Sequence, residues 1–217
     1  YPVRMVEVGG PRLRLDDADP DRDCFVEPVT GALPSADVRE WSAALALAWA
    51  AVRVDVPESA AMMDRLITTV VPTRPVLGRP AGASTTRAAF GAMAMPLSSP
   101  RTLACLLVEK VATLTVAAVQ DVCDLHVGSA RSARSAPRAR SSHVVGLTDA
   151  FGRVARLELM TAHVRAGRAV DRTAMSRLRE SLTNRLECLD RGDRWTDAGR
   201  LLLAGLRGRL DRAAVAA

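Results

Sequence analysis

The stretch from Ser99 to His126, SPRTLACLLVEKVATLTVAAVQDVCDLH, decides the fold because it is the longest segment with a clear helical pattern. Leu, Val and Ala recur in it at the spacing of a helix face, and both Ala and Leu are strong helix formers. We therefore predict one long helix over this stretch. The functional interpretation depends on which residues this helix carries on each of its sides.

The predicted helix has a polar side and an apolar side. At 100° per residue, its polar side chains cover about a third of the circumference. Val108 and Ala112 fall on the opposite, apolar side, where Leu107, Val111 and Val119 lie nearby. The polar side consists of Glu109, Lys110, Thr113, Gln120, Asp121 and Asp124.

The composition favours a mainly α fold. Apolar residues make up 48% of the 217 residues but aromatic residues only 3%, so the core must be built from Ala, Val, Leu and Met. Such a core suits close-packed helices, whereas strands draw more on aromatic residues. We expect a mainly α (α+β) chain, a helical domain with a small β element of short strands.

Local patterns place the remaining elements. Residues 3–15 alternate around Gly9-Gly10-Pro11 and predict a hairpin, whereas 67–71 and 82–95 predict two strands that pass close to each other. Ser35 is expected to cap a helix that carries Trp41 and Trp49. Further helices are predicted over 57–65, 144–166, 173–189 and 196–213.

These elements are expected to form one domain over residues 1–217. Its N-terminal part, about 1–97, would contain the strands and the first helices, and its helical part would span about 98–217. A low-complexity stretch rich in Ser, Ala and Arg, roughly 128–142, interrupts the helical part.

The net charge of +6 comes almost wholly from arginine, because Lys110 is the only lysine. A basic chain suits an acidic partner such as a peptide leader, a membrane surface or nucleic acid. Nucleic acid is disfavoured because no aromatic residues are interleaved with the arginines to stack on bases.

The four cysteines, Cys24, Cys105, Cys123 and Cys188, form neither a CxxC pair nor a dense disulfide pattern. Buried free thiols in a reducing cytosol are the expected state. No run of about 18 uninterrupted apolar residues predicts a membrane span, and no signal peptide is recognised. We therefore expect a cytoplasmic protein.

Several segments, in chain order, resemble the HExxH-motif peptide-modification family of actinobacterial clusters for ribosomally made peptides. LRLDDADP (13–20) resembles an acidic, proline-ended signature, and 33–49 resembles the helix that follows it. GASTTRAAFGA (82–92), after VVP (70–72), resembles the SAS…AFGA stretch of the family. WTDAGR (195–200) resembles its LTxAGR segment.

The resemblance covers nearly the whole chain and implies that it corresponds to the C-terminal portion of the family's full length. In the family these elements surround a metal site that supports oxygen- and 2-oxoglutarate-dependent hydroxylation of a peptide side chain at its β-carbon. That chemistry is implied for intact members only.

The family's metal-binding histidines are missing here. In HExxH, two imidazoles one helical turn apart reach one metal ion, but the aligned residues are Val108-Glu109-Lys110-Val111-Ala112. The resemblance places the third ligand, a histidine, at Asp149 in the run Gly146–Ala150. One carboxylate without imidazole partners binds iron or zinc poorly, so no metal and no other cofactor is expected.

The remaining acid–base candidates are Glu109, Asp149 and His143. Glu109 would act as a general acid or base if a pocket persists, or else be a solvated residue on the polar helix face. Asp149 has either a pocket role or an ion pair with Arg153 one turn later. His143 is the best replacement ligand or base, while His126 is expected at a helix end and His163 at the surface.

The low-complexity stretch carries Arg131, Arg134, Arg138 and Arg140. These arginines either form a solvated segment or recruit an acidic peptide by charge, as a tentative peptide-binding site. The Ser and Ala residues that flank them favour ordering only with a partner.

Two functions of different classes follow. The first is a metal-free accessory protein of peptide natural-product biosynthesis that binds a precursor peptide or a partner biosynthetic enzyme. The alternative is a repurposed, cofactor-independent enzyme for cyclisation, elimination or epimerisation of a modified peptide, with Glu109 and either His143 or Asp149 as acid or base. A hydroxylase with relocated iron ligands is a second alternative. The apolar helix over 201–210 also suits a homodimer in which it packs against its own copy.

Overall fold

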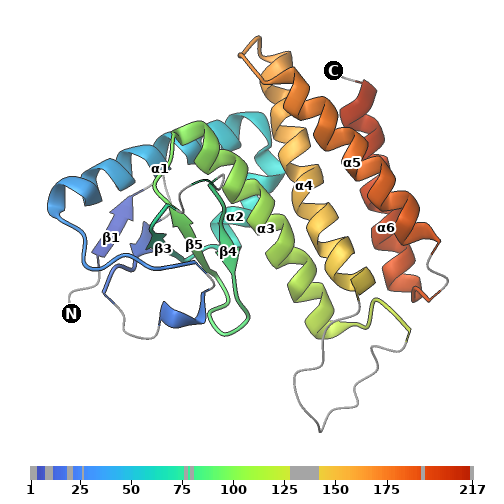
Figure 1. Cartoon of the computed structure of the whole chain (residues 1–217), viewed down its shortest axis with the longest axis horizontal. Coiled ribbons are helices and arrows are strands. Elements are labelled where there is room, and N and C mark those ends of the chain that lie inside the picture. The colour runs from blue at the N-terminus through green and yellow to red at the C-terminus, as the bar shows by residue number, and fades with distance from the viewer. Residues whose placement is uncertain are drawn as a thin grey trace, which may run out of the picture. The chain divides into compact units, whose positions relative to one another are not determined.

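The computed structural model describes residues 4–7, 12–18, 22–25, 27–75, 78, 81–127, 142–191 and 194–215. The chain divides into two compact units, Tyr1–Leu114 and Thr115–Ala217, and the division falls within one long helix. The first unit contains a small sheet, whereas the regular elements described in the second are all helices (Figure 1). The mainly α, α+β fold class is confirmed.

The first unit contains a five-stranded mixed sheet in the order β1-β2-β3-β5-β4. The predicted hairpin is confirmed, because β1 (Arg4–Glu7) pairs antiparallel with β2 (Arg12–Leu15). β3 (Thr69–Thr73) then lies parallel between β2 and β5 (Ala92–Pro96).

The segment predicted as one strand over 82–95 forms two. The two-residue strand β4 (Ser84–Thr85) runs antiparallel to β5. A turn separates them, and Gly91 at its end has a φ of +87°. A side chain at Gly91 would be strained, and its Cβ would lie 3.0 Å from the Leu66 carbonyl oxygen. The turn between β4 and β5 therefore depends on this glycine.

Each side of the sheet buries apolar residues. On one side, Leu13 and Leu15 share a face with Val70 and Met93, all essentially inaccessible to solvent. On the other side, Phe25 packs on Val71, Ala92 and Ala94, with the short 3₁₀ helix η1 (Arg22–Cys24) leading into Phe25.

Two helices connect β2 to β3. α1 (Ser35–Asp55) buries Trp41 and Trp49 at the predicted helical spacing, packs against α2 (Pro57–Leu66) and contacts β1. The prediction that Ser35 caps α1 is wrong. Ser35 is already the first helical residue, and Pro34, whose ring presets a helix-compatible φ, occupies the cap position without a side-chain hydrogen bond.

The long predicted helix is α3 (Pro100–Val122), which contains the division between the two units. It is the one helix among the described residues with the length and apolar composition to cross a membrane, and the core helix of a soluble protein passes the same test. In the first unit, Leu103, Ala104, Leu107 and Val108 are fully buried, as expected of a core helix.

The second unit is a bundle of α4 (Ser142–Arg165), α5 (Arg172–Asp190) and α6 (Asp197–Val215), with the end of α3. α4 packs extensively against both α5 and α6, whereas α5 and α6 touch each other less. The core of this unit includes Val116, Leu157, Leu182, Trp195 and Leu206.

Candidate functional site

The two positions on α3 at which the resemblance expects imidazoles lie on its apolar side. Val108 is fully buried, together with Leu107 and Val111, and Ala112 is half-buried. The apolar side of α3 predicted from the sequence is therefore part of the core of the first unit up to Leu114, whereas Val119 packs on the core of the second. Neither Val108 nor Ala112 has an atom that can donate an electron pair to a metal.

Glu109 keeps only a small fraction of its side chain in contact with solvent, 20%, rather than standing fully solvated on the helix. Its Oε1 atom lies 3.3 Å from Nζ of Lys110, which is buried to the same extent. The Glu109 carbonyl oxygen accepts a hydrogen bond of 2.7 Å from the Thr113 hydroxyl, an ordinary contact within the helix. Glu109 thus has a local cation beside it.

Asp149, at the expected third ligand position, is held by two arginines. Its Oδ2 atom lies 3.0 Å from Nε of Arg153, one turn later on α4, so the predicted ion pair is confirmed. The same oxygen lies 3.4 Å from a guanidinium nitrogen of Arg185 on α5. The sequence contained no signal for this second partner, because it depends on how α4 and α5 pack.

His143 forms an aromatic group with two residues that are distant in sequence. Its ring stacks nearly parallel on that of His126, with 5.3 Å between centroids, and both rings meet the edge or face of Trp195. His126 is buried, and the Trp195 indole N–H donates a 2.8 Å hydrogen bond to the Leu189 carbonyl oxygen. This group joins the two ends of the arginine-rich stretch to the start of α6.

The acid–base candidates are not brought into one described site. Glu109 belongs to the first unit, and His143 and Asp149 belong to the second. On α4, His143 and Asp149 are six residues apart, so they project about 120° away from each other around the helix. The expectation for His163 was wrong, since only 5% of it is exposed; the helix turns it inward, away from the exposed Arg165.

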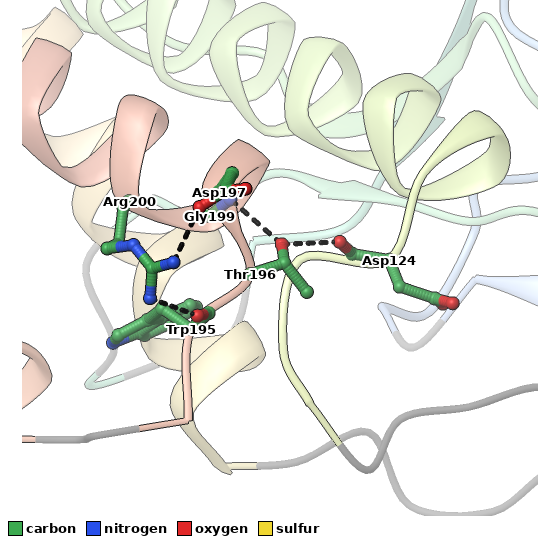
Figure 2. Close-up of polar contacts among 6 residues, drawn as sticks. All are labelled: Asp124, Trp195, Thr196, Asp197, Gly199 and Arg200. Carbon is green, nitrogen blue, oxygen red and sulfur yellow. Dashed lines mark hydrogen bonds and ion pairs between the residues drawn. The ribbon is translucent and has the colours of Figure 1, made fainter.

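The WTDAGR segment builds the start of α6, and Figure 2 shows its polar contacts. The Thr196 hydroxyl accepts a 3.1 Å hydrogen bond from the Gly199 N–H, as an N-cap does, and donates one of 2.7 Å to the Asp124 carbonyl oxygen (Figure 2). Arg200 donates to the Trp195 carbonyl oxygen at 2.7 Å and pairs with Asp197 at 2.5 Å. The segment thereby fastens α6 to the chain after α3.

Gly199 has no space for a side chain. A Cβ atom there would lie 2.1 Å from the Leu125 carbonyl oxygen and 2.9 Å from the Trp195 ring. The Leu125 carbonyl oxygen also accepts a 3.2 Å hydrogen bond from the Thr196 N–H. The Val127 N–H donates a 2.6 Å hydrogen bond to the Arg194 carbonyl oxygen. The close approach of these two backbones explains the glycine of the segment.

The other segments behind the resemblance also have structural roles. In LRLDDADP, the carboxylate of Asp17, 2% exposed, accepts a 2.6 Å hydrogen bond from the Leu33 N–H. In GASTTRAAFGA, Gly91 makes the turn into β5, and Ser84 donates to the carboxylate of Glu27. These contacts stabilise the loops and turns that connect helices and strands. A structural role therefore explains the residues of these segments without a catalytic one.

The tentative peptide-binding arginines, Arg131, Arg134, Arg138 and Arg140, lie outside the described residues. Among the residues that the structure does describe, no three side chains of His, Cys, Asp or Glu are grouped so that they could hold a metal ion. All four cysteines are described and all are free thiols, but the prediction that they are buried is wrong, because Cys24, Cys105 and Cys123 are half-buried and Cys188 is exposed.

Comparisons with known proteins add no identification. A scan against protein-family models finds no matching family, and a search of curated protein sequences finds no match either. The resemblance to the HExxH-motif family stays a prediction based on the quoted segments.

Proposed function

We propose that this chain is a divergent, metal-free member of the HExxH peptide-modification family that acts in the cytoplasm in ribosomal peptide natural-product biosynthesis. In this proposal it binds a precursor peptide or a partner biosynthetic enzyme and does not carry out the family's hydroxylation. The observation that carries the proposal is the environment of Val108, a donor-free side chain fully buried at a position where the resemblance expects an imidazole.

The chemistry of the three positions supports this proposal. Val108 and Ala112 offer only hydrocarbon, and the Asp149 carboxylate is already shared by two guanidinium groups. A carboxylate that is neutralised by arginines is a poor substitute for two imidazoles toward iron or zinc. The residues at these three positions therefore do not fit the metal of the family, and the proposed function involves no step at a metal ion.

The binding surface that we propose is the end of the second unit from which the arginine-rich stretch departs. The ring contact between His126 and His143 holds the two ends of that stretch together. Val127, which follows His126, and Val145, two residues after His143, expose 53% and 52% of their surface. Apolar side chains beside a stretch with four arginines and no acidic residue suit an acidic, amphipathic peptide.

The first test is a titration with a fluorescently labelled acidic amphipathic peptide, followed by anisotropy. Replacing Arg131, Arg134, Arg138 and Arg140 by Gln should weaken binding about tenfold or more and should flatten its dependence on salt. The matched control replaces Arg39, Arg65, Arg101 and Arg177, which are exposed elsewhere, by Gln and so removes the same charge. Equal losses in both variants would mean that net charge alone attracts the peptide.

The second test separates binding from catalysis. If the chain only binds the peptide, Glu109→Gln should leave the affinity for the peptide unchanged. The repurposed-enzyme alternative instead requires that this substitution stop a reaction of the peptide. Metal analysis of the purified native protein addresses the other alternative. Stoichiometric iron together with 2-oxoglutarate turnover would overturn the metal-free proposal.

A further inference from the structure

The exposed side of α6 carries a stripe of small and apolar residues with one charged residue at each end. At 100° per residue, Asp197, Leu201, Ala204, Gly205, Gly208 and Arg212 fall within an arc of about 100°. Leu201 is 74% exposed, the highest value among the large apolar residues of this unit apart from Val122. A Cβ atom at Gly205 would meet no atom within 4 Å, so this part of the helix surface is open.

From this surface we infer that the protein forms a symmetric homodimer in which α6 packs antiparallel against α6 of a second copy. The inference goes beyond the proposed peptide binding and does not depend on it. The crossing point lies between Ala204 and Gly205, where small side chains let the two helix axes approach closely. One surface then serves both copies, as a two-fold interface requires.

The stripe is complementary to its own reversed copy. Around this centre, Leu201 of one copy lies level with Gly208 of the other, which has no side chain of its own and is bordered by the Arg212 guanidinium, 3.4 Å from where a Cβ atom would lie. An open surface groove of about 640 Å³, lined in part by Leu203, Ala204 and Gly208, borders the stripe at this level. It offers space for the leucine of the second copy, and the same contact occurs twice.

The charges along α6 are complementary in the same arrangement. Asp197, whose side chain is 94% exposed although it pairs with Arg200 of its own chain, lies level with Arg212 of the other copy. A two-fold axis across the helices also brings the same flank of each copy together. On that flank Arg200 and Asp211, both exposed and both lining the groove, lie close to each other across the interface. Like charges do not meet at these four positions, which favours a second copy as the occupant.

The interface is a single pair of helices over about 16 residues, so the contact is short, about 24 Å long. This is a small surface compared with that of obligate dimers. We therefore expect a reversible dimer whose fraction rises with protein concentration.

Sedimentation velocity over a hundredfold range of concentration tests the inference. The wild type should shift from monomer to dimer, and Leu201→Lys should weaken dimerisation about tenfold or more, because it removes the apolar contact twice and adds two charges. Leu47→Lys is the matched control, since Leu47 on α1 is also a leucine that is 61% exposed. Circular dichroism checks that both variants fold.

Disulfide trapping tests the geometry. In a Cys188→Ser background, which removes the exposed native thiol, Gly205→Cys should cross-link to itself on oxidation because it lies next to the two-fold axis. Ser181→Cys, exposed on α5, is the control and should cross-link far more slowly. A wild type that stays monomeric, equal effects of the two lysine variants, or equal cross-linking of the two cysteine variants would each overturn the inference.

Discussion

At the scale of single residues, the interpretation depends most on Val108. A buried valine can be recognised from the sequence, because it recurs with Leu107 and Val111 on the apolar side of α3. The degree of burial was not predictable, and it decides how the position tolerates an imidazole. A polar ring placed there would lose its contact with water without gaining a partner.

Val108→His should therefore lower the free energy of unfolding by about 2–4 kcal/mol, as expected for a polar group buried in a packed core. Ala112→His is the comparison, because Ala112 is half-buried and its substituent has access to solvent. We expect less than about 1 kcal/mol there. Urea unfolding followed by circular dichroism measures both, and comparable losses at the two positions would contradict the assigned burial.

Only one of the two ion-pair partners of Asp149 could be predicted from the sequence. Arg153 lies one turn away on the same helix, and that spacing alone predicts the pair. Arg185 comes from α5, and no local pattern connects residues so far apart in sequence. The carboxylate is about one-third exposed, so these pairs contribute little to stability in water, and their main consequence is to occupy the oxygen.

Among the elements of the second unit, the start of α6 has a well-defined contact with the chain segment that follows α3. The hydroxyl of Thr196 caps the helix and also bonds to the chain after α3. Gly199 allows the backbone of Leu125 to approach, so the two segments lie closer than any side chain would permit.

Two glycines of α6 should respond in opposite directions to the same change. Gly199→Ala should destabilise the protein by about 1–3 kcal/mol, because its Cβ would overlap the Leu125 carbonyl oxygen. Gly205→Ala has open space and should stabilise the helix by about 0.5–1 kcal/mol. Thermal unfolding at a protein concentration low enough to keep the chain monomeric compares them, and a stabilised Gly199→Ala variant would show that the two backbones lie farther apart.

At the scale of the whole molecule, the chain contains two separately packed units. The core of the second unit is made only of residues from α3 onward, whereas the sheet with α1 and α2 forms the first. The expectation of one domain with parts at about 1–97 and 98–217 stays a prediction. The structural division lies within α3, about 17 residues later in the chain than the predicted boundary, because α3 contributes to the core of both units.

The thiols provide a test at this scale, because all four are free and none stabilises the chain by a covalent link. A thiol reagent should label Cys188 first, since it is exposed, and the three half-buried cysteines should react more slowly. Adding a reductant should leave the free energy of unfolding unchanged. Fewer than four reactive thiols in the unfolded protein, measured without reductant, would reveal a disulfide.

The sequence by itself determined the helices and the hairpin, since these follow from local periodicity and turn residues. It also shows that Val108 and Ala112, where the resemblance expects imidazoles, have no atom that can bind a metal ion. Only the tertiary structure decided that β3 lies between β2 and β5, that Arg185 reaches Asp149 and that His126 stacks on His143. The physical reason is that each of these contacts joins residues distant along the chain. Their proximity is set by how whole elements pack, which no local pattern records.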